Sequence, residues 1–229
     1  MDLFKRLEAE QTRLAQGIDL VNQVDVEDLR LVAGVDTAYW TSEDGVERGA
    51  CCVVVVDYRT HEVIQTVTTV GQPTVPYLPG LLAFRELPLL EEAIAQLNMP
   101  PDLFLFDGNG ILHPRRMGIA TQASFLVDRP TVGVAKTYYR VGDADYKSPA
   151  DEFGAISKIA ADEEVLGAAV RTRKGVKPVF VSVGNWIDLN TAVTVTLSLV
   201  EKASRLPVPL READLATHRA RRHAQNDSR

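Results

Sequence analysis

An apolar run with the sequence LRLVAGVD, residues 29–36, predicts a buried β-strand that ends in a carboxylate. A second run, DLFLFDG at residues 102–108, repeats this pattern and also places an aspartate near its end. Short apolar runs of this kind are typical of strands buried in an α/β sheet. Asp36 and Asp107 would therefore open into the crevice at the carboxyl ends of the strands, where ligands bind in such sheets.

The segments around these two strands predict a mixed sheet flanked by helices. Two runs, GACCVVVVDY at 49–58 and EVIQTVTTV at 62–70, predict a hairpin that pairs antiparallel with the first strand. The remaining predictions are helices at 2–15, 81–97, 115–127 and 188–202, a strand at 131–136, a loop at 141–162, and a second hairpin from 163–172 and 177–183. A three-stranded meander followed by helix, strand, helix and strand predicts an α/β fold of the ribonuclease H-like type.

Composition sets the broad class of the protein. The chain has 229 residues, of which 45% are apolar and 24% charged, and this predicts one globular domain over 1–229 with a flexible tail at about 215–229. No apolar run approaches the roughly 18 residues that a membrane span needs. Cys51 and Cys52 lie side by side in a predicted strand and favour reduced cysteines in the cytoplasm. The formal charge of −6 is a weak argument against a nucleic-acid partner, because binding depends on local patches.

Five residues are candidates for chemistry. Two carboxylates that converge at strand ends repel each other, and a divalent cation that coordinates both relieves the repulsion, so Asp36 and Asp107 are candidate metal ligands. An aspartate before glycine is equally common in a turn, which leaves a structural reading open for Asp107. Glu86 lies in a predicted helix and His113 precedes a proline, and both positions have ordinary structural explanations. Lys136 ends a predicted strand and would direct its charge toward the same crevice.

Strings spread over most of the chain resemble the endonuclease V family in order and spacing. They are AGVDTAY (33–39), VPYLPGLLAFRE (75–86), FDGNGILHPRRMGIATQASF (106–125), PTVGVAKT (130–137), VFVSVG (179–184) and RLPVPLREAD (205–214). Together they span about 180 residues. The second and third strings are too long and too unusual for chance agreement, whereas VDTAY alone would be weak.

This resemblance implies a ribonuclease H-like nuclease that binds Mg²⁺ or Mn²⁺. It implies nicking at the second phosphodiester bond 3′ to inosine or deoxyinosine, in repair or inosine turnover, by a protein that we expect to be a monomer. DNA and RNA both stay open as the substrate, because the contacts to the 2′-hydroxyl cannot be located from sequence. The implied catalytic residues are Asp36, Glu86, Asp107, His113 and Lys136, with Asp36, Asp107 and Glu86 at the metal and with His113 and Lys136 beside the scissile phosphate.

The resemblance also implies a nucleic-acid surface at the Pro-rich segment QPTVPYLPG, residues 72–80. Its prolines restrict the backbone and would present Tyr77 as a wedge that fills the gap left by a flipped base, although a buried loop aromatic is the alternative. The expected nucleic-acid-binding residues are Pro76, Tyr77, Leu78, Pro79, Gly80, Leu82, Gly108, Arg115 and Ile119. A basic turn at 171–177 would contact phosphates or lie free in solvent.

One position departs from the family pattern. After VSVG the family usually places a histidine at the metal site, whereas this chain has Asn185. Asparagine offers Mg²⁺ a neutral oxygen but lacks the imidazole nitrogen that binds Mn²⁺ and other transition metals well. Three hypotheses stay open: an active metal-dependent endonuclease with Asn185 as a fourth ligand, an inosine-nucleic-acid binding module with impaired catalysis, and a ribonuclease H-like enzyme that cuts hybrids or junctions without regard to inosine.

Overall fold

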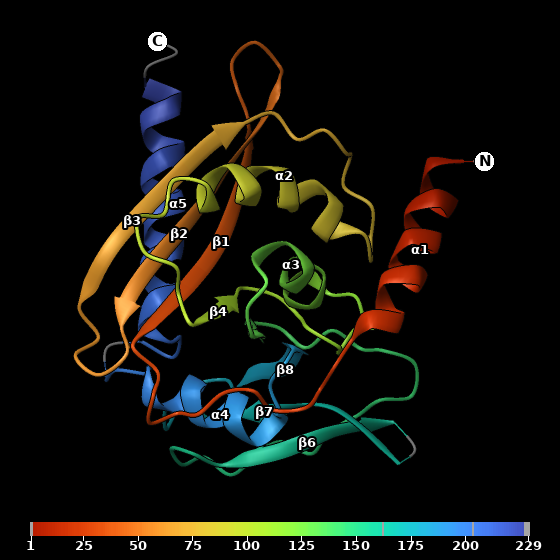
Figure 1. Cartoon of the computed structure of the whole chain (residues 1–229), viewed down its shortest axis with the longest axis vertical. Helices are drawn as coiled ribbons and strands as arrows, with labels where there is room; N and C mark the ends of the chain where they lie inside the picture. The colour runs from red at the N-terminus through yellow and green to blue at the C-terminus, as the bar shows by residue number, and fades with distance from the viewer. Residues whose placement is uncertain (1, 162, 203, 227–229) are drawn as a thin grey trace.

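The structure, a computed structural model, describes residues 2–161, 163–202 and 204–226. In this part of the chain eight strands form one mixed sheet, in the order β3-β2-β1-β4-β5-β8-β7-β6 (Figure 1). The strands are β1 (Leu31–Thr41), β2 (Glu47–Asp57), β3 (Val63–Gly71), β4 (Leu103–Phe106), β5 (Thr131–Ala135), β6 (Ile156–Ala161), β7 (Glu164–Val170) and β8 (Val179–Asn185). The helices are α1 (Leu3–Leu14), the short 3-10 helix η1 (Ala15–Gly17), α2 (Leu82–Ile94), α3 (Ile119–Val127), α4 (Leu189–Ser198) and α5 (Val208–Asn226).

The direction of the strands decides which residues meet. Strands β1, β4 and β5 are parallel, so their carboxyl ends lie at the same edge of the sheet. The hairpin of β2 and β3 extends the sheet antiparallel to β1, as predicted, and β8, β7 and β6 extend it antiparallel on the side of β5. The predicted mixed sheet with flanking helices is confirmed.

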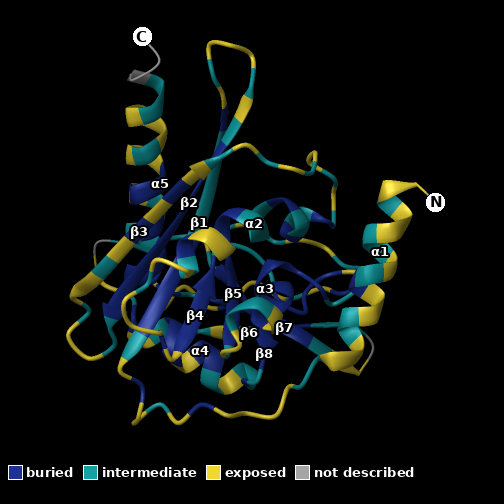
Figure 2. Cartoon of the chain, turned by 45° about the horizontal axis from the view of Figure 1, so that its top comes forward, coloured by how far each residue is buried: buried dark blue, intermediate teal, exposed yellow. Residues whose placement is uncertain are grey.

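Both faces of the central strands are buried (Figure 2). Alternate side chains of a strand point to opposite faces. Val32 packs on the face that α4 and α5 cover, while Val35 packs on the face that α2 and α3 cover. This double burial explains why the strand sequences are nearly continuous apolar runs.

Helix α5 lies directly on β1 at Gly34. A Cβ atom on Gly34 would stand 2.2 Å from the backbone carbonyl carbon of Pro209, so the contact requires glycine. Asp36 is two residues further along the strand and therefore points to the same face. The close approach at Gly34 consequently places Asp36 against the following turns of α5.

Two segments differ from the sequence-based expectation. The predicted loop at 141–162 contains β6, which pairs with β7 as the edge strand of the sheet. The predicted flexible tail from about 215 is instead helical through residue 226, and residues 227–229 lie outside the described residues. The tail continues helix α5, whose apolar stripe of Leu210, Ala213 and Ala216 is buried at helical spacing and extends only one turn into the tail.

The predicted helices are present with shorter bounds. Helix α2 continues through Pro88 without a break, and α3 begins at Ile119 rather than at 115. Asp188 caps α4, because its carboxylate accepts a hydrogen bond from the Thr191 backbone N–H at 2.8 Å. In the part of the chain that is described, no helix is long and apolar enough to cross a membrane.

Candidate metal centre and nucleic-acid pocket

Three aspartates converge at the carboxyl ends of the parallel strands. The backbone N–H of Asp107 donates to the Val35 carbonyl at 3.1 Å, so Asp107 directly follows β4 beside Asp36 on β1. Helix α5 brings Asp214 to the same place. One carboxylate oxygen from each of these three aspartates lies within 4.8 Å of the others. The sequence identified the first two, but Asp214 was quoted only as the end of a matching string and received no role.

Lys136 binds two members of this group. Its Nζ lies 2.6 Å from Asp107 Oδ2 and 2.6 Å from Asp214 Oδ1. Burial alone would lower the pKa of Lys136, but the hydrogen bonds to the two aspartates and their charges outweigh it and raise the pKa. Lys136 is therefore a permanent cation beside the aspartates, at the strand end where the sequence placed it.

Asp36 is held by Thr217, a buried residue on α5. Thr217 Oγ1 donates to Asp36 Oδ2 at 2.7 Å and also contacts the Asp214 backbone carbonyl at 2.9 Å. Burial raises the pKa of Asp36 to about 6, and the charges of Asp107 and Asp214 add to the rise against the opposing effects of Thr217 and Lys136. The cost of gathering like charges thus contributes to the raised pKa.

The donor atoms suit a hard divalent cation. The three aspartates, of which Asp36 and Asp107 were predicted as ligands, offer only carboxylate oxygens, the ligand type that Mg²⁺ and Mn²⁺ prefer. Three carboxylates outnumber the single ammonium of Lys136, so negative charge remains for a cation to neutralise. The residues present therefore fit a metal ion.

Glu86 faces this cluster from α2 without joining it. Burial, and secondly the charges of Asp36 and Asp107, raise the pKa of Glu86 to about 8. In the described residues no oxygen of Glu86 belongs to the group that lies within 4.8 Å. The group within 4.8 Å therefore adds Asp214 to the two predicted aspartates and does not include Glu86, which was also a predicted metal ligand.

Asn185 lies at the other end of the sheet. Because β8 runs antiparallel to β5, Asn185 pairs with Thr131 at the start of β5, whereas Lys136 follows the end of that strand. The Asn185 side chain is fully buried, accepts from the Asp19 backbone N–H at 2.7 Å and donates to Ser124 Oγ at 3.1 Å. The expectation that Asn185 is a metal ligand is wrong, since its amide anchors the segment that follows α1.

A cavity of about 160 Å³ lies at the segment that directly follows Asp107. The predicted pocket residues that line it are Tyr77, Gly80, Leu82, Gly108 and Ile119. Gly108 connects the cavity to the aspartate cluster, because this lining residue directly follows Asp107 in the chain. Tyr77 is 66% exposed, which excludes the alternative of a buried loop aromatic. Pro76, Leu78 and Pro79 flank Tyr77 in the chain but do not line the cavity.

His113 belongs to this cavity, where both of its ring nitrogens are already in use. Nδ1 accepts from the backbone N–H groups of Arg115 at 3.2 Å and Met117 at 3.3 Å, so the proton resides on Nε2, which donates to the Gly80 carbonyl at 3.0 Å. Burial, and secondly the charge of Arg115, lower the pKa of His113 to about 4. The expected catalytic role of His113 at the phosphate conflicts with this geometry, which makes it a neutral wall of the pocket.

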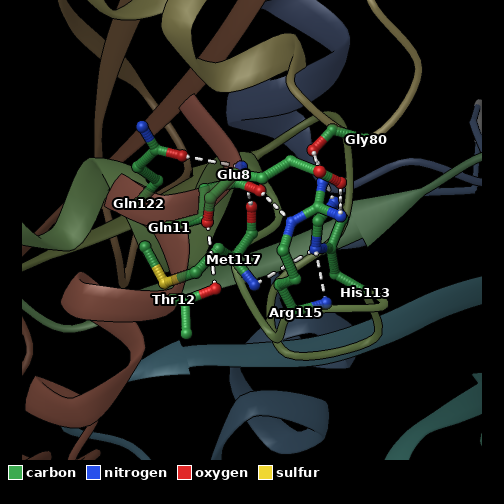
Figure 3. A network of polar contacts seen from close by, with 8 residues as sticks. All are labelled: Glu8, Gln11, Thr12, Gly80, His113, Arg115, Met117 and Gln122. Carbon is green, nitrogen blue, oxygen red and sulfur yellow. Dashed lines mark hydrogen bonds and ion pairs between the residues drawn. The ribbon is translucent and has the colours of Figure 1, made fainter. Parts of the chain in front are cut away.

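Arg115 is committed to protein contacts rather than to a nucleic-acid phosphate. Its guanidinium donates to Gln11 Oε1 at 2.7 Å, to Glu8 Oε1 at 2.6 Å and to the Gly80 carbonyl at 3.0 Å (Figure 3). The expectation that Arg115 binds nucleic acid is therefore corrected. The sequence around Arg115 could not indicate these contacts, because Gln11 and Glu8 lie more than 100 residues away in the chain.

A larger cavity of about 610 Å³ lies at the opposite end of the sheet. It is lined by Asp102 at the start of β4, by Asp128 before β5 and by Trp186 after β8. None of the predicted site residues lines it. The smaller cavity is the better candidate because it is lined by predicted pocket residues, among them Gly108, which directly follows Asp107.

The chain is similar to proteins of one family over nearly its whole length. A family model described as Endonuclease V matches residues 12–215. An Endonuclease V of Bacillus thuringiensis subsp. konkukian is 46% identical over 96% of this chain and 93% of its own length. An Endonuclease V of Bacillus subtilis is 52% identical over 80% of this chain and 77% of its own length.

Solved structures agree with these sequence comparisons. The crystal structure of the Bacillus subtilis Endonuclease V has a TM-score of 0.95 at 46% identity, and the match covers 99% of this chain and 95% of that one. The Ciona intestinalis Endonuclease V, crystallised with a 24mer DNA containing an inosine followed by a ribo-adenosine, has a TM-score of 0.84 at 26% identity, with coverage of 96% and 98%.

Proposed function

The chain belongs to the endonuclease V family, and from this membership we propose that it cleaves a nucleic-acid strand at the second phosphodiester bond 3′ to inosine, with Mg²⁺ or Mn²⁺ as the cofactor. The substrate is DNA, RNA or both, and the protein acts as a monomer. The observation that carries the proposal is the convergence of Asp36, Asp107 and Asp214, together with a cavity that is lined by Tyr77 and by Gly108, the residue after Asp107.

The three aspartates would hold the metal. A bound divalent cation supplies an activated water and stabilises the departing oxygen in phosphodiester hydrolysis. Lys136 lies between Asp107 and Asp214 and would offset the negative charge that gathers on the phosphate. Thr217 fixes the orientation of Asp36 through its hydrogen bond, and so positions one ligand from the helix side.

Glu86 would handle a proton rather than bind the metal directly. Its raised pKa of about 8 lets the carboxyl group take up or release a proton near neutral pH. It faces Asp36 and Asp107 from α2, on the side of the sheet opposite to α5. We assign it the role of orienting a water molecule near the cluster.

The cavity would receive the flipped base. Tyr77 is held between Pro76 and Pro79 and is largely exposed, so it is suited to fill the gap left in a base stack. A likeness to the Ciona intestinalis protein, crystallised with inosine-containing DNA, supports inosine as the recognised base. The backbone at Gly80 and Gly108 lines the cavity and can approach a base closely, because neither residue has a side chain.

The alternative of a binding module with impaired catalysis has lost its basis. It rested on Asn185 as a defective metal ligand, and Asn185 lies at the far end of β5. Carboxylates gathered near a phosphate would weaken binding unless a metal ion intervened. The cluster of three aspartates therefore favours an active nuclease over a protein that only binds inosine-containing strands.

The test is a nicking assay on matched DNA and RNA strands that differ only by one inosine, in Mg²⁺ and in Mn²⁺. We expect the inosine strand to be cleaved only when the metal is present. The rate of this cleavage should fall by a factor of roughly 100 or more in Asp36→Ala. Asp57→Ala, which changes an aspartate at the end of β2, is the matched control and should retain activity. Equal cleavage of plain strands, or no metal-dependent cleavage, would refute the proposal.

A further inference from the structure

Helix α1 is joined to the rest of the protein through a buried amide. Gln11 is the buried residue of this helix, with no exposed surface. Its Nε2 donates to the Met117 carbonyl at 3.2 Å and to Gln122 Oε1 at 3.0 Å, while its Oε1 accepts from Arg115 at 2.7 Å (Figure 3). Both amide hydrogens and one oxygen lone pair are thus used. A buried polar network that is fully satisfied fixes one arrangement of its members.

Arg115 connects helix α1 to the Gly80 carbonyl through its hydrogen bonds. The guanidinium spans Gln11 Oε1, Glu8 Oε1 and the Gly80 oxygen, and its planar fork holds the three acceptors in one geometry. The same Gly80 oxygen accepts from His113 Nε2 at 3.0 Å. Two donors therefore fix the orientation of the peptide group that follows Gly80, a residue with a φ of +77°.

Two series of hydrogen bonds therefore connect α1 to the cavity proposed to receive the flipped base, which we call the base pocket. One passes from Glu8 and Gln11 through Arg115 to Gly80, and the other from Gln11 directly to Met117. Both Gly80 and Met117 line the cavity of about 160 Å³. The helix thus contacts two separate parts of the chain around the pocket, the Pro-rich segment and the segment before α3.

Glu8 and Gln11 precede the residues 12–215 that the family model matches. We propose that α1 is a specificity element of the base pocket, in which Gln11 and Glu8 are positioning residues that hold Arg115, Gly80 and Met117 in the shape that accepts the base. This inference rests on the proposed function. Shifts of about 1 Å in a positioning group lower rates strongly, so loss of the network should be felt at the pocket.

The expected signature is a loss of selectivity for inosine. Only the inosine strand places a base in the pocket, whereas a plain strand binds through its backbone without flipping. Removing Gln11 or Glu8 should therefore lower kcat/KM for the inosine strand by about tenfold. The inhibition constant of a plain competitor strand should stay unchanged, as should the Mg²⁺ concentration for half-maximal activity, because the aspartates are not in the network.

The experiment measures these three quantities for Gln11→Ala, Glu8→Ala and Glu8→Gln in the full chain. Glu8→Gln keeps an oxygen that can accept from Arg115 and should restore most of the selectivity that Glu8→Ala loses. Arg13→Ala is the matched control on the same helix, since the Arg13 guanidinium donates to Glu10 at the surface. It should behave as the wild type.

The outcomes separate this inference from the proposed function. If the wild type cuts plain and inosine strands equally, the proposed function fails and this inference fails with it. Suppose instead that the wild type is selective, and that Gln11→Ala and Glu8→Ala have the same kcat/KM for the inosine strand and the same inhibition constant for the plain strand as the wild type. Helix α1 then only stabilises the fold, and the inference is overturned. Thermal unfolding shows whether each variant is folded. Glu8→Ala is the milder change, because Glu8 is one-third exposed, and it decides the question if Gln11→Ala does not fold.

Discussion

The ammonium group of Lys136, at the end of β5, lies 2.6 Å from a carboxylate oxygen of Asp214 on α5. This contact joins the last helix of the chain to the strand ends that carry Asp36 and Asp107. Helix α5 is therefore part of the candidate metal centre, and its close packing on Gly34 makes the contact geometrically available.

Metal-free protein should lose stability through Asp36 as the pH rises. The pKa of Asp36 is raised to about 6, so the folded protein binds this proton more tightly than the unfolded chain does. Stability from a raised carboxyl pKa is fully present below the unfolded value of about 4 and is lost as the pH rises through about 6. We expect Asp36→Asn to match the wild type in melting temperature near pH 4 and to exceed it at pH 7 in a chelator, as measured by thermal unfolding. A constant difference across this range would contradict the assignment.

Replacement of Asn185 should affect stability and leave metal binding unchanged. Asn185→Ala leaves the Asp19 N–H and the Ser124 hydroxyl without their buried partner, which costs about 1–3 kcal/mol. Denaturant unfolding measures this loss, and titration calorimetry measures the metal affinity. The exposed Asn190 on α4 provides the control variant Asn190→Ala, which should be nearly neutral. A large drop in metal affinity for Asn185→Ala would return this residue to the metal site.

His113→Gln should weaken action on the inosine strand without changing the pH profile. His113 is neutral above pH 5 because burial, and then Arg115, lower its pKa to about 4. We expect a drop in kcat/KM of roughly tenfold from the loss of the contact to Gly80. The shape of the profile between pH 5.5 and about 8 should be the same in both proteins. Disappearance of an inflection near pH 6.5 in the variant would identify His113 as a titrating catalytic group instead.

Tyr77→Ala should reduce affinity for the inosine strand. Stacking of a base on an aromatic side chain contributes about 1–3 kcal/mol, or about 5- to 150-fold in affinity. Tyr77→Phe keeps the ring and serves as the matched control. Fluorescence anisotropy with inosine and plain strands measures both affinities. Equal weakening by both variants would assign the effect to the hydroxyl group and exclude a wedge.

The sequence was sufficient to predict those strands and strand-end residues that are indicated by the pattern of a few neighbouring residues. Apolar runs predicted β1 and β4, and the rule that ligands bind at the carboxyl ends of parallel strands selected Asp36, Asp107 and Lys136. The hairpin of β2 and β3 followed from two short runs joined by a three-residue turn. Each of these inferences uses information that lies within a few residues.

The contacts that the sequence missed, and the predictions that the structure corrects, depend on segments that are distant in the chain. Thr217 and Asp36 are 181 residues apart, and nothing in the local pattern of α5 indicates which strand it packs against. The direction of β8 relative to β5 likewise places Asn185 at the wrong end of the sheet for metal binding. His113 and Arg115 were assigned to the substrate because their partners, Gly80 and the side chains of α1, come from elsewhere in the chain.

We infer that Asp36, Asp107 and Asp214 together hold the metal. The most direct measurement is the affinity of Asp214→Asn for Mn²⁺ by titration calorimetry, with Glu212→Gln as the control that removes the same charge nearby on α5. We expect Asp214→Asn to bind Mn²⁺ at least about tenfold more weakly than the wild type, and Glu212→Gln to bind it nearly as well. Wild-type affinity in Asp214→Asn would contradict the three-aspartate site.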